Sequence, residues 1–97
     1  MTYELAFLAP ALKEWNKLDE QTRRQFKAKL AERLENPHVP ASRLSGSANR
    51  YKIKLRAAGW RLVYEVRDAQ VLVLVIAVGK RDKDAVYRNA EGRSLKS

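Results

Sequence analysis

The residues of this chain that could do chemistry are cations in its second half. From 51 to 66 the sequence reads YKIKLRAAGWRLVYEV, which is typical of two strands joined by a tight turn. A hairpin closed over Ala58 and Gly59 is favoured because glycine adopts a positive φ without steric cost, and it pairs residue 57 with residue 60. Opposed residues of an antiparallel ladder share a face. This pairing gathers four cations on one face: Lys52, Lys54, Arg56 and Arg61.

The opposite face of the predicted hairpin is apolar. It carries Tyr51, Ile53, Leu55, Trp60, Leu62, Tyr64 and Val66. A slip of one residue would mix the two faces, so the segregation of charge supports the pairing. The aromatic side chains on this face are more typical of a core than of platforms for base stacking.

A second group of cations follows an apolar run. Lys80 and Arg81 come after VLVLVIAVG and should emerge at a strand end beside the hairpin, with Lys83, Tyr87 and Arg88 close behind. Such cations can neutralise a phosphate and stabilise a pentacovalent transition state, and a tyrosine can stack on a base. A lysine crowded by other cations has a lowered pKa and can exchange a proton near neutral pH. Charge alone favours phosphate binding over catalysis, and both stay open.

Most other catalytic devices are missing from the sequence. His38, the single histidine, lies between prolines in a loop-like segment, so a histidine pair is impossible and an ordinary loop histidine is the preferred interpretation. The acidic residues Glu65, Asp68, Asp82 and Asp84 are few and surrounded by cations, which disfavours a metal site. No phosphate-binding glycine loop or dinucleotide fingerprint is present. We therefore expect no metal and no cofactor.

The elements that must position these side chains are predicted by periodicity. Residues 2–8 alternate as a short strand, and Pro10 fits the first turn of a first helix. Asp19 is a suitable N-cap for a second helix, which should end at Asn36 because Pro37 follows. The apolar stripes of the two helices are Leu8, Leu12, Trp15 and Leu18 in the first, and Phe26, Leu30 and Leu34 in the second.

The second half of the chain combines a long loop with strands. Residues 36–49 have the composition of a loop and are numerous enough to be mobile or functional. The run 71–78 is apolar on both alternating faces, as expected for an interior strand, which Gly79 should end. A short helix is predicted over 82–89, and the tail 90–97 should be frayed.

These elements predict an α+β fold with the order β-α-α-β-β-β. Two N-terminal helices should pack on one face of a small, largely antiparallel sheet, with the long apolar strand in its centre and a short C-terminal helix at the end of the chain. A length of 97 residues allows one domain, 1–97.

The net charge of +9 is unevenly distributed. Residues 1–36 hold seven Lys/Arg and six Asp/Glu, whereas residues 37–97 hold thirteen and five. One basic surface is expected to meet a polyanion, with nucleic acid as the leading candidate and a generally solvated basic surface as the alternative. The sequence has neither a run of about 18 apolar residues for a membrane span nor a basic signal segment, and its lack of cysteine fits a cytoplasmic setting.

Four segments together resemble the RelE-type toxins of bacterial and archaeal toxin–antitoxin pairs. They are ALKEW near the first helix, RLSG in the loop, the hairpin sequence YKIKLRAAGWRLVYEV, and VLVIAVGKRDKDAVY near the end. The resemblance covers residues 3–87 and is strongest from residue 51 onward. It implies a RelE/ParE-like fold and a ribosome-dependent endoribonuclease that cuts mRNA in the ribosomal A site. The implied reaction is metal-free attack of a 2′-hydroxyl on the adjacent phosphodiester, which leaves a 2′,3′-cyclic phosphate.

The resemblance also implies roles for the matching residues of this chain. Lys52 and Lys54 would help to activate the 2′-hydroxyl and hold the phosphate, and Arg61 would stabilise the charged transition state. Arg81 would serve the leaving 5′-oxygen, and Tyr87 would stack on and orient the nucleotide. Further contacts to RNA or phosphate are expected from the flanking cations Arg56, Lys80, Lys83 and Arg88.

Partners are implied by the same resemblance. They are the ribosome, through its A site and 16S ribosomal RNA, the mRNA, and a cognate RelB-like antitoxin that wraps the toxin and displaces its C-terminal helix. Operator DNA would be met only through the antitoxin complex, and no membrane is expected. Two alternatives stay open: a ParE-like inhibitor of DNA gyrase, which does not need the five catalytic candidates together, and a non-catalytic RNA- or ribosome-binding module.

Overall fold

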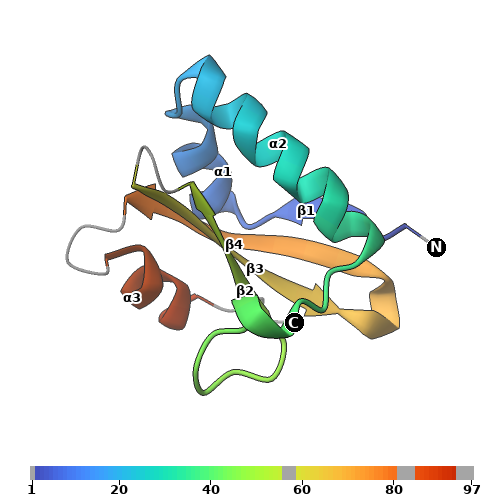
Figure 1. Ribbon diagram of the computed structural model, residues 1–97. Helices are drawn as coiled ribbons and strands as arrows, with labels where there is room; N and C mark the ends of the chain where they lie inside the picture. The colour runs from blue at the N-terminus through green and yellow to red at the C-terminus, as the bar shows by residue number, and fades with distance from the viewer. Residues whose placement is uncertain (1, 56–58, 81–84, 94–97) are drawn as a thin grey trace.

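The computed structural model describes residues 2–55, 59–80 and 85–93, and its elements follow the predicted order (Figure 1). The strands are β1 (Glu4–Phe7), β2 (Arg50–Leu55), β3 (Trp60–Arg67) and β4 (Leu72–Lys80). The helices are α1 (Ala9–Asn16), α2 (Glu20–Glu35) and α3 (Ala85–Glu91). Short 3-10 turns lie at Pro40–Ser42 and Asp68–Gln70. Within the described residues no helix is long and apolar enough to cross a membrane.

The strands form one mixed sheet in the order β1-β4-β3-β2. β2 with β3 and β3 with β4 pair antiparallel, whereas β1 pairs with β4 in parallel. The prediction of a largely antiparallel sheet is confirmed, and the long apolar strand β4 lies inside it. The sheet leaves β2, which carries two of the candidate lysines, at one edge.

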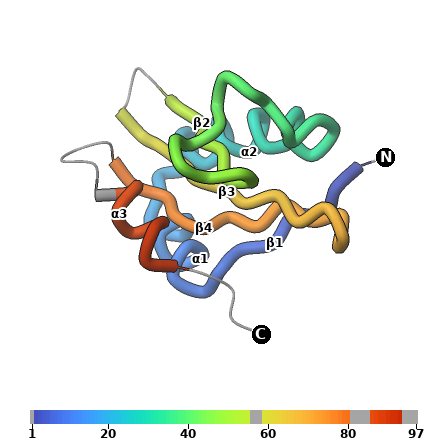
Figure 2. Tube along the Cα trace, turned by 90° about the horizontal axis from the view of Figure 1, so that it is seen from below, coloured from blue at the N-terminus to red at the C-terminus, as the bar shows by residue number. Residues whose placement is uncertain are grey.

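Both faces of the sheet are covered, which explains why β4 is apolar on both sides. α1 and α2 lie on one face and α3 on the other (Figure 1, Figure 2). The larger core lies under α1 and α2 and includes the fully buried Phe26, Ile53 and Tyr64. The smaller core lies under α3 and includes Val63 and Ile76.

The predicted limits of the N-terminal helices are confirmed at three points. Pro10 lies in the first turn of α1, where a missing N–H costs no hydrogen bond. The Asp19 side chain caps α2 by accepting the backbone N–H of Thr22 at 3.3 Å. α2 ends at Glu35, so Asn36 is its C-cap and Pro37 follows.

The predicted register of the hairpin was wrong by two residues. Leu55 pairs with Trp60 and Lys54 with Arg61, so the connection spans residues 56–59 instead of Ala58 and Gly59 alone. Gly59 does adopt a positive φ of 72°, and its N–H donates to the Leu55 carbonyl at 3.0 Å. A shift of two residues preserves the faces, because side chains alternate with a period of two.

Three further predictions need correction. Gly79 does not end the apolar strand: it pairs with Arg61 inside β4, and a Cβ at this position would be in ordinary contact with the Val86 Cβ of α3, at 3.5 Å. Leu12 is 43% exposed, because the buried stripe of α1 runs through Ala11 and Trp15 instead. The C-terminal helix ends at Glu91 and not at residue 89, so the first residues of the predicted frayed tail are helical, and Ala90 is buried. The predicted start at residue 82 and the tail residues 94–97 lie outside the described residues.

Candidate active site

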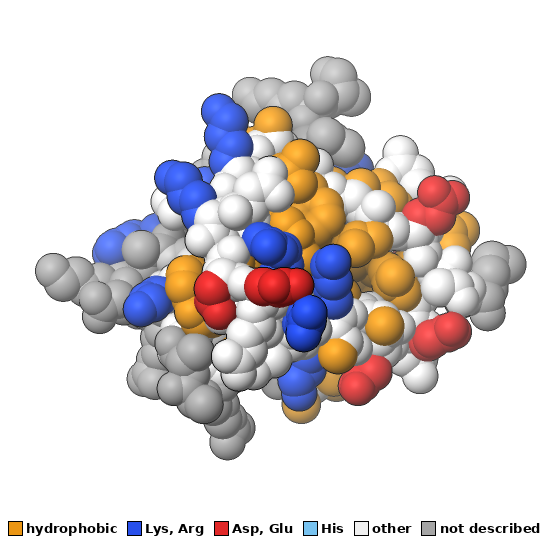
Figure 3. Space-filling view, turned by 90° about the horizontal axis from the view of Figure 1, so that it is seen from above, with side chains coloured by type: hydrophobic (Ala, Val, Ile, Leu, Met, Phe, Trp, Pro, Cys, Tyr) orange, Lys and Arg blue, Asp and Glu red, His pale blue; other side chains and the backbone are white. Residues whose placement is uncertain are grey.

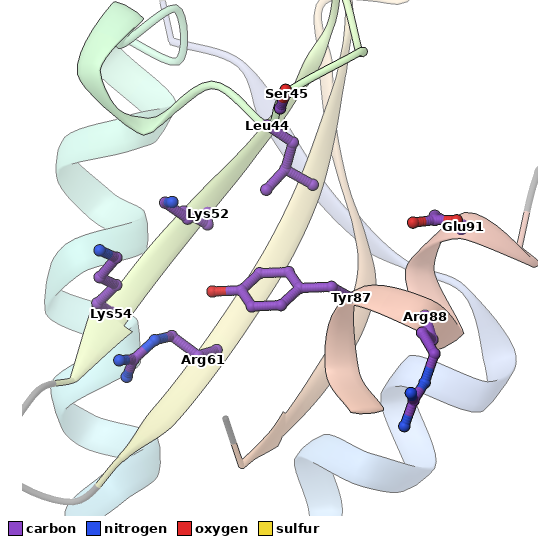
Figure 4. Close-up of a pocket in the computed structure, with 8 residues that line it drawn as sticks. All are labelled: Leu44, Ser45, Lys52, Lys54, Arg61, Tyr87, Arg88 and Glu91. Atoms are coloured by element: carbon purple, nitrogen blue, oxygen red, sulfur yellow. The ribbon is translucent and has the colours of Figure 1, made fainter. Parts of the chain in front are cut away.

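A cleft of about 630 Å³ opens between the β2–β3 hairpin and α3. It is called the cationic cleft here, and it is lined by Leu44, Ser45, Lys52, Lys54, Arg61, Tyr87, Arg88 and Glu91 (Figure 4). Four of the five predicted catalytic residues therefore meet in one place, although the sequence separates the first and last of them by 35 positions. Of the C-terminal residues expected beside the hairpin, Tyr87 lines this cleft, Lys80 does not, and Arg81 lies outside the described residues.

The hairpin supplies three of the four through strand alternation. Lys52 and Lys54 project from β2 on the same face, and Arg61 projects from β3 directly opposite Lys54. Their neighbours Ile53 and Leu62 point into the core on the other face. Burial of the apolar face thus forces the cations together on the side of the sheet that carries α3.

Arg61 is the most enclosed of the three cations. The residue is 5% exposed. One terminal nitrogen of its guanidinium donates to the carbonyl of the preceding residue, Trp60, at 2.9 Å. Lys52 is half-buried and Lys54 is exposed. A guanidinium held in this way presents its other N–H groups from a restricted position, as a bidentate phosphate contact requires.

Tyr87 completes the cleft from the opposite side. It is half-buried on α3, where it packs against the smaller core that includes Val63 and Val86. Figure 4 shows its hydroxyl pointing across the cleft towards the three cations of the hairpin. The arrangement offers cations for a phosphate at one end and an aromatic face for a base beside them.

The other predicted site residues lie elsewhere or outside the described residues. Lys80, at the end of β4, does not line the cationic cleft; its ammonium lies 5.5 Å from the centroid of the Trp60 ring. Arg88 lines the cleft, but its side chain points away from Tyr87 in Figure 4. Arg56, Lys83 and the fifth catalytic candidate, Arg81, belong to segments outside the described residues.

Sequence reasoning missed three residues that line the cleft. Leu44 and Ser45 come from the loop 36–49, which is held against β2 by a 2.9 Å hydrogen bond from the Leu44 N–H to the Arg50 carbonyl. Glu91 is the last residue of α3. The length of the loop was a general signal of function, and its RLSG segment, which contains Leu44 and Ser45, belongs to the family resemblance. Neither signal indicated that these two residues would face the cations.

His38 lies outside the cationic cleft, in agreement with its interpretation as a loop histidine. Its Nδ1 lies 3.2 Å from the Tyr51 hydroxyl and its Nε2 2.8 Å from the Asp68 carboxylate, which also accepts from the Tyr3 hydroxyl at 2.6 Å. The hydrogen bond from the Tyr3 hydroxyl, and then the one with His38, hold the pKa of Asp68 below its usual value. The bond between Tyr3 and Asp68 also raises the pKa of Tyr3. This network ties the loop to the sheet.

The face covered by the N-terminal helices carries side chains of both charges (Figure 3). Seen from that side, Lys/Arg and Asp/Glu side chains are interspersed (Figure 3). The lining of the cationic cleft instead combines four cations with one carboxylate. Among the described residues, no group of three or more histidine, aspartate or glutamate side chains could hold a metal ion.

Comparison with known proteins identifies close relatives. Residues 5–85 match the family described as the ParE toxin of the type II toxin–antitoxin system parDE. The chain is 52% identical over 95 residues to the mRNA interferase toxin RelE of Escherichia coli strain K12, covering 98% of this chain and 100% of that protein.

Solved structures give the same result. A mutant of E. coli RelE in the free state superposes with a TM-score of 0.90 at 50% identity, covering 98% of this chain and 100% of the other. The toxin chain of the intact E. coli RelBE toxin–antitoxin complex superposes with a TM-score of 0.79 at 54% identity, covering 80% and 95%.

Proposed function

The chain belongs to the RelE-type toxins of the RelE/ParE superfamily, and on that premise we propose that it is an mRNA interferase that cleaves mRNA in the ribosomal A site. The observation that carries the proposal is the meeting of Lys52, Lys54, Arg61 and Tyr87 in one cleft. These are the side-chain types that a phosphodiester and a neighbouring base require.

The proposed reaction is an internal phosphoryl transfer. The 2′-oxygen loses its proton and bonds to the adjacent phosphorus, the bond from phosphorus to the 5′-oxygen breaks, and the 5′-oxygen takes up a proton. Lys52 and Lys54 assist the first proton transfer and hold the phosphate, and Arg61 neutralises the charge of the pentacovalent transition state. Arg81 serves the leaving oxygen, and Tyr87 stacks on the nucleotide.

The cleft supports dependence on the ribosome. The chain's single histidine does not line the cleft, so the proposed proton transfers have no imidazole to use as general acid or base. Alignment of the attacking oxygen, phosphorus and leaving oxygen can supply a large part of the rate, and the ribosome can impose it on the mRNA. Weak cleavage of free RNA is the expected result, and vigorous cleavage of naked RNA by the purified protein would contradict it.

A cognate antitoxin is the proposed protein partner. E. coli RelE, to which this chain is about half identical, has been solved in complex with the antitoxin RelB. We infer that a RelB-like chain neutralises this toxin, that operator DNA is met only through that complex, and that the toxin works in the cytoplasm, where ribosomes and mRNA lie.

Inhibition of DNA gyrase is the second candidate, because the matching family is described as ParE toxins. Two relatives that are each 52% identical to this chain carry the mRNA interferase name instead. A gyrase inhibitor has no need of a phosphate-binding lysine pair, a buried arginine and a tyrosine in one cleft. The geometry therefore favours the ribonuclease.

Mapping of mRNA 5′ ends against ribosome position in cells separates the candidates. Expression of the wild type should produce cuts locked to the reading frame, and Arg81→Ala should abolish them. Arg24→Ala is the matched control: it removes one arginine from an exposed pair with Glu20 on α2, on the other face of the sheet, and should cut like the wild type. Intact mRNA together with inhibited supercoiling would establish the gyrase alternative.

A further inference from the structure

The guanidinium of Arg50 joins the start of β2 to the end of α3. One terminal nitrogen donates to the Ala90 carbonyl oxygen at 2.5 Å, and the other donates to the Arg93 carbonyl oxygen at 2.7 Å. The Nε nitrogen donates to the Glu65 carboxylate at 3.0 Å. All three side-chain nitrogens therefore bond within the protein. The last carbonyls of a helix lack partners inside the helix, and a cation is a favourable partner for them.

Glu65 holds this guanidinium in place from β3. The residue is 7% exposed and pairs with Arg50 through one carboxylate oxygen and with Arg67, at 2.8 Å, through the other. The two arginines differ in their other contacts. Among the described residues no hydrogen bond joins Arg67 to α3, and the Nε of Arg67 is buried without a hydrogen-bond partner. Loss of either arginine leaves Glu65 paired with the other one. Arg67 is therefore a matched control for Arg50.

The position of α3 determines where Tyr87 lies. The helix has seven residues, too few to be stable without tertiary contacts. Ala90 follows Tyr87 by three positions, which is nearly one turn, so a fixed Ala90 carbonyl limits movement of the turn that carries Tyr87. The main chain of Arg50 meanwhile holds the opposite loop wall, since its carbonyl accepts from the Leu44 N–H.

We propose that Arg50 is a positioning residue that fixes Tyr87 relative to the three cations of the cationic cleft. Arg50 is not among the described residues that line the cationic cleft, and it acts through the end of α3. The kinetic part of this inference rests on the proposed ribonuclease function. The positioning itself does not, and a spectroscopic measurement tests it separately.

The kinetic test measures single-turnover cleavage of mRNA on programmed ribosomes. A displaced contact near the reacting atoms can cost about 100-fold in rate, so Arg50→Met is expected to slow cleavage by about tenfold to 100-fold. Arg67→Met should stay within about twofold of the wild type, because it leaves Arg50 on Glu65 and on α3. In a Tyr87→Ala background, Arg50→Met should add less than about threefold, because the residue it positions is gone.

The spectroscopic test uses fluorotyrosine and ¹⁹F NMR on the free protein. The chain has four tyrosines, and the resonance missing from Tyr87→Phe assigns Tyr87. Arg50→Met should shift or broaden that resonance, whereas Arg67→Met should leave it unchanged. Arg50→Lys keeps a positive charge beside Glu65 but cannot bond to both carbonyls, so it should change the Tyr87 resonance in the same way by a smaller amount. This variant provides the test if Arg50→Met does not fold.

The outcomes are distinguishable. An unchanged Tyr87 resonance in the folded Arg50 variants overturns the proposal. The proposal also fails if Arg50→Met slows cleavage by the same factor in the wild-type background and in the Tyr87→Ala background. If the wild type cleaves no mRNA on ribosomes, the ribonuclease proposal fails, and the fluorine spectra alone decide whether Arg50 positions Tyr87.

Discussion

Lys54 and Arg61 lie directly opposite each other on the β2–β3 ladder, on the face that forms the cationic cleft. Like charges in such a cross-strand pair lower the stability of a sheet by about 0.2–1 kcal/mol. The larger core on the other face compensates, because it buries Ile53 and Leu62 from the same two strands. A phosphate-binding site requires cations placed side by side, and the packing of the other face of the hairpin offsets the repulsion between them.

Lys54→Ala is expected to separate activity from stability. Cleavage on ribosomes should fall by about 100-fold or more if this lysine takes part in proton transfer. The free energy of unfolding should change by less than about 1 kcal/mol, because Lys54 is exposed and the core is untouched. Single-turnover rates and urea titrations provide the two measurements. Lys29→Ala, at an exposed position of α2, is the control, and an equal loss of cleavage there would refute a specific role for Lys54.

The hairpin shows which parts of the site can be predicted from a sequence. Its cationic and apolar faces follow from alternation alone, and they survive a register error of two residues. The register itself depends on the backbone conformation of the turn, and Ala57-Ala58-Gly59 is compatible with both a two-residue and a four-residue connection. Sequence therefore predicted which residues share a face but not which ones pair.

The opposite wall of the cleft could not be predicted in the same way. Leu44, Ser45 and Glu91 reach the cleft through long-range contacts of the loop and of α3. The contacts of α3 include those of Arg50, whose guanidinium donates to main-chain carbonyls 40 and 43 positions away. Periodicity carries no information about such partners.

Two substitutions of Tyr87 should separate its ring from its hydroxyl. Tyr87→Phe keeps the ring and is expected to lower kcat by about tenfold with little change in KM, because the hydroxyl points towards the cations. Tyr87→Ala should also raise KM, since stacking of a base on an aromatic ring is worth about 1–3 kcal/mol. Steady-state cleavage of ribosome-bound mRNA measures both constants. Identical kinetics for the two variants would show that the hydroxyl alone matters.

Asp68 should make stability depend on pH at the acidic end. Hydrogen bonds from Tyr3 and then His38 lower the pKa of Asp68 in the folded protein. The ionised carboxylate therefore stabilises the fold above its pKa in the unfolded chain, about 3.9, and this stabilisation is lost as the pH falls through its pKa in the folded protein. Asp68→Asn should therefore lower the urea midpoint at neutral pH, and the difference from the wild type should shrink below about pH 4. Urea titrations across this range test the sign. A difference that does not vary with pH would contradict it.

Tyr64→Phe is expected to destabilise the fold without touching the cationic cleft. Tyr64 is fully buried, its hydroxyl donates to the Pro37 carbonyl at 2.8 Å, and Arg33 donates to the hydroxyl at 2.9 Å. Phenylalanine fills the same space but leaves both partners without this bond, at a cost of about 1–3 kcal/mol in the free energy of unfolding. Burial also raises the pKa of Tyr64, so the wild type should lose stability above about pH 10, where the unfolded tyrosine ionises first.

The Tyr64 hydroxyl is a point where α2, the loop after it and β3 meet, so its removal should also loosen that loop. Tyr3→Phe is the matched control, because it removes an exposed tyrosine hydroxyl bond, the one to Asp68. Urea titration should show a much smaller loss for Tyr3→Phe than for Tyr64→Phe. Equal losses would mean that burial of the Tyr64 bond adds nothing. The part of the loop that lines the cationic cleft is held by a different bond, from the Leu44 N–H to the Arg50 carbonyl. The Tyr64→Phe variant should therefore retain cleavage at temperatures where the protein stays folded.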